Sequence, residues 1–219
     1  MWSYYGSKSK IAHLYPAPKH DNIIEPFAGT ARYSYLYWTK QVTLVEKFDK
    51  IVRIWKYLQQ ASEKDILKLP DVESGEYIGD KYQYLCDEER WLIGFGINGG
   101  SSIPKKTAGS KSFNVWKRDK ERIATNLHRI RHWNIILGDY TLAPDITATW
   151  FIDPPYFIQR KYYRYKDVDY VQLADWCKSR KGEVIVCENS DATWMDFQPL
   201  VNMKGQRRTT LECMWYRDA

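Results

Sequence analysis

Several features that would place the chain in a specialised class are scarce in its sequence or missing from it. The only cysteines are Cys86, Cys177, Cys187 and Cys213, and no two form a C-x-x-C pair. We therefore expect reduced, mostly buried thiols, with no disulfide framework and no structural zinc. No apolar run approaches the roughly 18 residues of a membrane-spanning helix, and the first residues do not form a signal peptide. These absences predict a soluble, cytoplasmic protein without a bound metal.

What the sequence does contain is a globular composition with an excess of positive charge. Its 219 residues are 44% hydrophobic and 27% charged, which predicts one domain with a sizeable core. Aromatic residues reach 16%, with 17 Tyr and 10 Trp, and the net charge is +6. Cations and aromatic rings together suit a polyanionic partner, although a solvated basic surface has the same composition.

Short apolar strands alternate with helical segments along most of the chain. Strands that lead into turns or helices are expected at 22–30, 41–46, 134–140, 149–152 and 183–187, with an antiparallel pair at 200–203 and 208–216. Apolar residues recur at helical spacing in 51–58 and 169–178. Five crossover strands and a terminal hairpin predict an α/β, Rossmann-like fold, with a mixed seven-stranded sheet and helices on both faces.

The tetrapeptide Asp153-Pro154-Pro155-Tyr156 follows the buried strand 149–152. Each proline pushes the preceding residue out of the helical region, so the strand cannot run straight into a helix. The resulting turn would present a carboxylate, a carbonyl and an aromatic ring at the sheet edge where α/β folds bind ligands. These groups can accept both hydrogen bonds of an amino group while the tyrosine stacks on a ring. A proline turn with an N-capping aspartate is the alternative that these four residues leave open.

A glycine turn and two acids follow earlier strands of the predicted sheet. Glu25-Pro26-Phe27-Ala28-Gly29-Thr30 carries a strand through a turn into a helix, a layout that can hold a nucleotide-like cofactor. Glu46 ends the next strand 17 residues after Gly29, near the position from which an acid binds ribose hydroxyls in dinucleotide-binding folds. Gly138-Asp139-Tyr140 places another acid after the third strand. The turn has one glycine and is not a pyrophosphate-binding pattern.

Residues 59–131 interrupt the alternation, and a helix from 119 to 131 is expected to close this insertion. Between Trp91 and Arg118 the chain has five cations and no acid, interleaved with glycines and aromatics. Such a stretch can contact phosphates and bases, and a flexible solvated insertion is the alternative. A second basic, tyrosine-rich stretch follows at 159–166. The residues expected to contact nucleic acid are Asn98, Lys105, Lys106, Lys111, Asn114, Lys117, Arg118, Arg160, Lys161, Tyr163 and Arg164.

Taken together, these motifs resemble those of the Dam-like DNA adenine methyltransferases, which carry a DPPY motif after their cofactor motif. Tyr4-Tyr5-Gly6-Ser7-Lys8 resembles the family's N-terminal cofactor-side motif, the Glu25–Gly29 turn its S-adenosylmethionine loop, and Asp153–Tyr156 its catalytic tetrapeptide. Glu46 matches the ribose-binding acid, and Gly138-Asp139-Tyr140 the acidic turn near the cofactor's adenine. Thr30-Ala31-Arg32 departs from the family, which usually has small residues or a second glycine there.

The resemblance implies a class I S-adenosylmethionine-dependent methyltransferase domain formed by 1–58 and 132–219, with 59–131 as an inserted target-recognition subdomain. It implies that the catalytic residues are Asp153, Pro154, Pro155 and Tyr156. The cofactor-binding residues that it implies are Tyr5, Gly6, Lys8, Glu25, Pro26, Phe27, Ala28, Gly29, Thr30, Glu46, Lys47, Asp139, Tyr140 and Asp153. The partner would be double-stranded DNA, bound by a monomer or weak dimer.

The implied reaction is methyl transfer to the exocyclic nitrogen of an adenine that has been flipped out of the duplex. Asp153 and the Pro154 carbonyl would accept its two N–H bonds, and Tyr156 would stack on the ring. Three alternatives stay open: methyl transfer to cytosine N4, transfer to adenine in RNA, and a nucleic-acid-binding relative that has lost catalysis.

Overall fold

A computed structural model describes residues 1–97, 100–109, 112–158, 165, 167–204 and 209–218. Its elements in chain order are η1 (Ala12–Leu14), β1 (Asn22–Glu25), α1 (Arg32–Leu36), β2 (Gln41–Glu46), α2 (Asp49–Gln60), α3 (Glu63–Leu67), α4 (Ile78–Lys81), α5 (Asp87–Gly96), α6 (Ser112–Ala124), η2 (Leu127–Ile130), β3 (Asn134–Leu137), η3 (Tyr140–Leu142), β4 (Ala148–Ile152), α7 (Tyr170–Ser179), β5 (Gly182–Asn189), β6 (Gln198–Lys204) and β7 (Thr209–Arg217).

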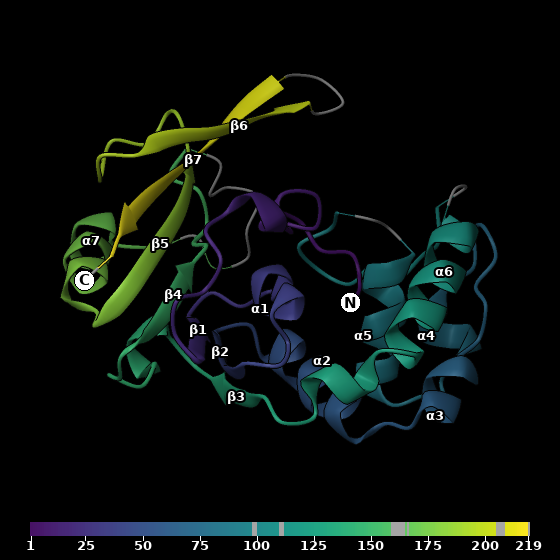
Figure 1. The fold of residues 1–219 in the computed structure, drawn as a ribbon. Coiled ribbons are helices and arrows are strands. Elements are labelled where there is room, and N and C mark those ends of the chain that lie inside the picture. The colour runs from purple at the N-terminus through teal and green to yellow at the C-terminus, as the bar shows by residue number, and fades with distance from the viewer. Residues whose placement is uncertain (98–99, 110–111, 159–164, 166, 205–208, 219) are drawn as a thin grey trace.

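The strands form one seven-stranded sheet in the order β3-β2-β1-β4-β5-β7-β6 (Figure 1). The first five are parallel to one another, and β7 runs antiparallel between β5 and β6. The predicted α/β, Rossmann-like fold is therefore confirmed, including the terminal antiparallel pair. The strand order reverses between β1 and β4, and such a switch point opens a crevice at the carboxyl ends of the strands.

Both faces of the sheet are buried, because successive side chains of its central strands alternate between two hydrophobic clusters. Ile23, Phe151 and Ile185 join the cluster that contains residues of α2, α3, α5 and α6. Ile24 and Trp150 point the other way, into the cluster with η3 and α7. This alternation explains why the strands read as continuous apolar runs in the sequence.

Residues 59–131 form the helices α3 to α6 and η2, which lie beyond α2 on one side of the sheet (Figure 1). One prediction here was wrong: the closing helix does not start at 119, because α6 already begins at Ser112. Trp116 is fully buried and its indole N–H donates to the Pro70 carbonyl at 2.9 Å. Trp116 and Ile123 are seven residues apart on one face, so core packing extends the helix through the basic stretch.

Two further predictions concern the burial of the cysteines and the length of the apolar helices. All four cysteines are unpaired, and three of them, Cys177, Cys187 and Cys213, are buried, as expected. Cys86 is exposed. Among the described residues, every helix is too short or too polar to span a lipid bilayer.

Candidate functional site

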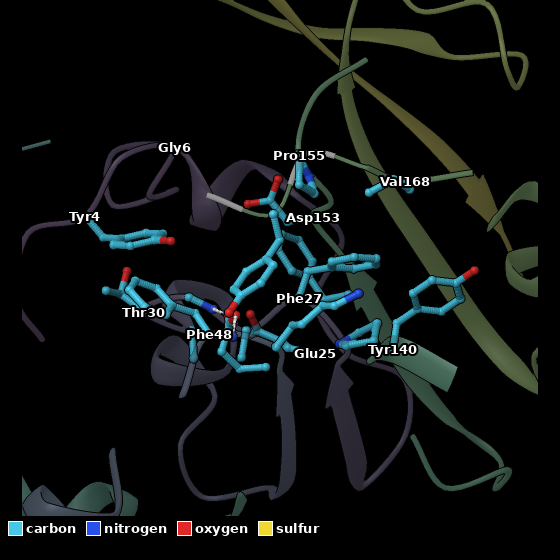
Figure 2. Close-up of a pocket in the computed structure, with 18 of the residues that line it drawn as sticks. Tyr4, Gly6, Glu25, Phe27, Thr30, Phe48, Tyr140, Asp153, Pro155 and Val168 are labelled. Atoms are coloured by element: carbon cyan, nitrogen blue, oxygen red, sulfur yellow. Dashed lines mark hydrogen bonds between the residues drawn. The ribbon is translucent and has the colours of Figure 1, made fainter. Parts of the chain in front are cut away.

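A pocket opens at the carboxyl ends of β1, β2 and β4, at the switch point of the sheet (Figure 2). All fourteen residues predicted to bind the cofactor line it, although they come from five separate parts of the sequence. Figure 2 shows Asp153 and Pro155 on one side of this space, Phe27 and Tyr140 on another, and Tyr4 near Thr30. Further lining residues are Tyr4, Ser7, Ala31, Arg32, Phe48, Gly138, Phe151, Pro155, Tyr165, Asp167, Val168, Asp169 and Gln172.

The glycine turn after β1 is held by the acid at the end of β2. Gly29 has a φ of +45°, which favours glycine, and its N–H donates to Glu46 Oε2 at 2.8 Å. The second oxygen, Oε1, accepts the Phe48 N–H at 2.8 Å. On the other side of the turn, the Trp55 indole N–H donates to the Gly29 carbonyl at 2.9 Å. Glu46 therefore fixes the shape of the turn through two backbone N–H groups.

Glu46 also retains capacity for a ligand. An ionised carboxylate offers about four acceptor positions, and backbone N–H groups take one on each oxygen. Burial raises the pKa of Glu46, and the N–H bonds from Phe48 and Gly29 oppose that shift. A diol placed against this carboxylate would supply the remaining hydrogen bonds, so the geometry fits the ribose-binding role that the resemblance implies.

Ala31, directly after the glycine turn, is the described non-glycine residue with a positive φ, at 44° with ψ 51°. This left-handed conformation costs an L-residue roughly 1–2 kcal/mol relative to the helical region. Ala31 has no side-chain group that could cap α1, so the capping must come from elsewhere.

Glu25 provides that capping from the end of β1. It is only 2% exposed, and its Oε1 accepts the Ser34 N–H in the first turn of α1 at 2.7 Å. Burial raises the pKa of Glu25 to about 8, so the neutral acid predominates at pH 7. The structure thus gives Glu25 a structural role at the edge of the pocket in addition to its place in the pocket wall.

Phe27 and Tyr140 form an aromatic wall of the pocket. Their rings stack with centroids 5.4 Å apart and an interplanar angle of 27°. Beside them, Lys47 Nζ lies 3.2 Å from Asp139 Oδ2, and both side chains are substantially exposed. An aromatic wall next to a carboxylate suits a flat heterocycle with an amino group.

Asp153 is paired with Lys8, which the N-terminal segment brings to the end of β4. Lys8 Nζ lies 2.7 Å from Asp153 Oδ1 and is itself buried. Burial raises the pKa of Asp153 to about 6, and the charge and hydrogen bond of Lys8 oppose the shift. A carboxylate with this pKa is mostly ionised at neutral pH and can accept hydrogen bonds there.

Tyr156 and Pro154 lie behind the pocket and do not line it, whereas Asp153 and Pro155 do. The Tyr156 hydroxyl donates to Glu212, and Lys8 Nζ lies over its ring, 4.6 Å from the centroid. The predicted stacking of Tyr156 on a base would require the ring face now covered by Lys8 to become available. The Pro155 carbonyl accepts from the Tyr170 hydroxyl, which fixes the proline turn to α7.

Behind the pocket, Tyr15, Tyr156 and Glu212 form one hydrogen-bonded cluster. Glu212 and Tyr15 were not predicted from the sequence. Glu212 is buried on β7 and accepts the Tyr15 hydroxyl at 2.6 Å as well as that of Tyr156. An acid in the otherwise apolar run from Leu211 to Tyr216 is a signal that could have identified Glu212. Tyr15 carries no comparable signal among the many tyrosines of the chain.

The residues predicted to contact nucleic acid are only partly described. Lys105, Lys106, Lys117 and Arg118 are exposed. The backbone of the loop around Lys105 and Lys106 is pinned, since Lys105 N donates to the Gly94 carbonyl at 3.0 Å and Lys106 O accepts from Ile78 N at 2.8 Å. Asn114 lies in α6, but its side chain is outside the description. Asn98, Lys111, Arg160, Lys161, Tyr163 and Arg164 lie outside the described residues.

This loop also reaches the pocket. The N–H of Tyr5, a lining residue, donates to the Ser101 carbonyl at 3.2 Å. The inserted segment and the N-terminal motif are therefore in direct contact at the pocket edge. Within the described residues, no three His, Cys, Asp or Glu side chains gather as a metal site.

Comparisons with known proteins do not assign the chain to a family. No family model matches the sequence, and no curated protein matches it. Among solved structures, the chain is similar to a conserved hypothetical protein from Streptococcus pyogenes, with a TM-score of 0.36 and 9% sequence identity. The match covers 88% of this chain and 84% of that one.

Proposed function

We propose that the chain is an S-adenosylmethionine-dependent methyltransferase that modifies the exocyclic amino group of adenine in double-stranded DNA. The observation that carries the proposal is the convergence of separate motifs on one pocket. The N-terminal motif, the glycine turn, Glu46, Asp139 and Asp153 all line the same space at the switch point of the sheet. Parallel strands bring their own carboxyl ends together, but the N-terminal motif follows no strand, and its arrival in the same pocket is what topology alone does not explain.

The residues of the pocket fit the cofactor by their donor and acceptor chemistry. Glu46 would accept hydrogen bonds from the ribose hydroxyls. The adenine would lie against the wall formed by Phe27 and Tyr140, with Asp139 accepting from its amino group. The N-terminal motif and the glycine turn would hold the methionine end. When bound, S-adenosylmethionine supplies a methyl group activated by its sulfonium charge.

Asp153 supplies the acceptor for the substrate's amino group. Its Oδ1 already holds an N–H donor, the ammonium of Lys8, at 2.7 Å. An exocyclic amino group is a donor of the same kind, so it would compete with Lys8 for this oxygen. Accepting its N–H bonds directs the nitrogen lone pair towards the methyl group and stabilises positive charge that develops on the nitrogen.

Exposed cations offer a surface for the phosphate backbone. Lys105 and Lys106 lie on the pinned loop that contacts the N-terminal motif through Ser101, and Lys117 and Arg118 lie on α6. Phosphate contacts position a duplex without reading its sequence. The target base would have to leave the stack to reach Asp153, at a cost of a few kcal/mol.

The proposal is tested by cofactor binding and transfer measured on the same preparations. Titration calorimetry with S-adenosylmethionine should show binding to the wild type and weaker binding to Glu46→Gln. The matched control is Glu183→Gln. Glu183 is a fully buried carboxylate, whereas Glu46 is partly buried, and Glu183 accepts from Thr149 and from the Lys19 N–H, away from the pocket.

With labelled cofactor, the wild type should transfer label to duplex DNA and Asp153→Ala should not, while still binding the cofactor. Lack of cofactor binding by the folded wild type would refute the proposal. Cofactor binding without methyl transfer to any nucleic acid would favour the alternative that this protein binds nucleic acid and has lost catalysis.

A further inference from the structure

Glu212 connects the terminal hairpin to the catalytic turn. It lies on β7 opposite Asn189 of β5, and its side chain is 8% exposed. Its Oε1 accepts hydrogen bonds from two tyrosines, Tyr15 at 2.6 Å and Tyr156 of the tetrapeptide. Three segments that are distant in sequence therefore meet on one carboxylate oxygen.

The same oxygen lies near the ammonium that occupies Asp153. Lys8 Nζ is 2.7 Å from Asp153 Oδ1 and 3.6 Å from Glu212 Oε1. Lys8 is only 6% exposed, so its charge is not stabilised by bulk water. The ammonium is thus placed between two carboxylates, with the closer contact to Asp153.

This placement matters when an amino group binds to Asp153. The incoming N–H donor competes with Lys8 for the Asp153 carboxylate. The Gly6 carbonyl also accepts from Lys8, at 3.4 Å, but a buried ammonium that loses its contact with a carboxylate is strongly disfavoured. Exchanging a contact with Asp153 for one with Glu212 keeps Lys8 paired. The required displacement is small, because Lys8 Nζ already lies 3.6 Å from Glu212 Oε1.

We infer that Glu212 is a positioning residue of the catalytic turn, which fixes Tyr156 and accepts Lys8 when the substrate's amino group displaces it from Asp153. This inference rests on the proposed function for the identity of the substrate. It goes beyond that function by assigning a role to a residue of the terminal hairpin. It also accounts for a buried acid that lies behind the pocket and does not line it.

The test uses Glu212→Gln, which keeps the side-chain volume and an acceptor oxygen for the tyrosines but removes the charge that attracts Lys8. We expect the single-turnover rate of methyl transfer to fall about tenfold, with cofactor affinity unchanged. Glu183→Gln is the control for loss of a buried carboxylate, and it should leave the rate unchanged. A wild-type rate in Glu212→Gln would overturn the inference.

A second arm separates this role from mere structural support. In a Lys8→Met background, no ammonium needs a second acceptor, so adding Glu212→Gln should cause no further loss of rate. An equal loss in both backgrounds would show that Glu212 supports the fold alone, and would overturn the inference.

A third arm does not depend on methyl transfer. Carbon-13 NMR of the Asp153 carboxyl should give a lower pKa in Glu212→Gln than in the wild type, because a neighbouring negative charge has been removed. An unchanged or higher pKa would contradict the arrangement. If the wild type transfers no methyl group, the proposed function fails, and this titration still decides whether Glu212 acts on the Lys8–Asp153 pair.

Discussion

The pH dependence of methyl transfer provides a strict test of the role given to Asp153. The perturbation is a decrease in pH from 8 to 5, because the ionised carboxylate is the stronger hydrogen-bond acceptor and can stabilise positive charge on the amino nitrogen. Burial raises the pKa of Asp153 to about 6 despite the attraction of Lys8. A raised pKa means that the carboxylate is lost as the pH falls through 6, well above the range of an ordinary aspartate.

The expected size of the effect follows from this value. With a pKa of about 6, roughly nine-tenths of Asp153 is ionised at pH 7, half at pH 6 and one-tenth at pH 5. The single-turnover rate should therefore fall about tenfold between pH 7 and pH 5. This fall in rate at low pH is the acid limb of the pH profile. Removing the ammonium with Lys8→Met should move the acid limb to higher pH, since Lys8 lowers the pKa of Asp153.

Several other groups face or influence Asp153, so the assay needs controls. They are Lys8, Glu212, Glu25, Glu188, Tyr4, Tyr15, Tyr156 and Cys187. Burial raises the pKa of Glu188 to about 7, and Glu188 accepts the Phe157 N–H directly after the tetrapeptide. The limb should persist in Glu188→Gln. A rate that stays constant from pH 7 to pH 5 would refute the reasoning about Asp153.

Three further predictions concern stability, each measured by urea unfolding without ligand. Ala31→Gly should raise the free energy of unfolding by about 0.5–1 kcal/mol, because relief of the left-handed backbone strain exceeds the added entropy of the unfolded chain. A lower free energy of unfolding would contradict the strain at Ala31. At pH 7 Glu25→Gln should change the free energy of unfolding little, since the neutral acid form of Glu25 predominates. Glu25→Ala should cost about 1–3 kcal/mol, because it leaves the Ser34 N–H unpaired. Equal effects of the two would refute the neutral acid. Trp116→Ala should cost about 3–5 kcal/mol, because Trp116 is fully buried against Gly96, and a cost under about 1 kcal/mol would mean that α6 does not pack as described.

The sheet could be predicted well because its physical signals are local. Each parallel strand is a short apolar run, and the burial of both sheet faces makes such runs continuous. The strand 41–46 was predicted with the bounds that β2 has. The start of α6 could not be predicted in the same way. Its apolar face there depends on Trp116, and the burial of Trp116 against the Pro70 segment is a tertiary contact.

More residues of the pocket could be predicted than of the hydrogen-bonded cluster of Tyr15, Tyr156 and Glu212 behind it. Acids and a glycine at the ends of parallel strands must meet at one sheet edge, so Glu46, Asp139 and Asp153 could be placed together from topology. The partners of these acids come from elsewhere. Lys8 reaches Asp153 across 145 positions of sequence, and Glu212 reaches Tyr156 through the antiparallel β7. No local pattern encodes such long-range pairing.

The position of Tyr156 illustrates the same limit. From the sequence, the aromatic residue of the tetrapeptide was expected to present its ring to a base. The structure ties its hydroxyl to Glu212 and places Lys8 over its ring, so access to that face depends on where Lys8 lies. The turn between Asp153 and Tyr156 is itself held, because the Pro155 carbonyl accepts from the Tyr170 hydroxyl.

The central claim is that this pocket directs a methyl group to the amino nitrogen held by Asp153. The most direct measurement is mass spectrometry of nucleosides after duplex DNA and, separately, RNA have been incubated with the protein and labelled S-adenosylmethionine. We predict labelled N6-methyladenine in DNA from the wild type and none from Asp153→Ala. Labelled N4-methylcytosine, label in RNA alone, or full activity of Asp153→Ala would contradict the account.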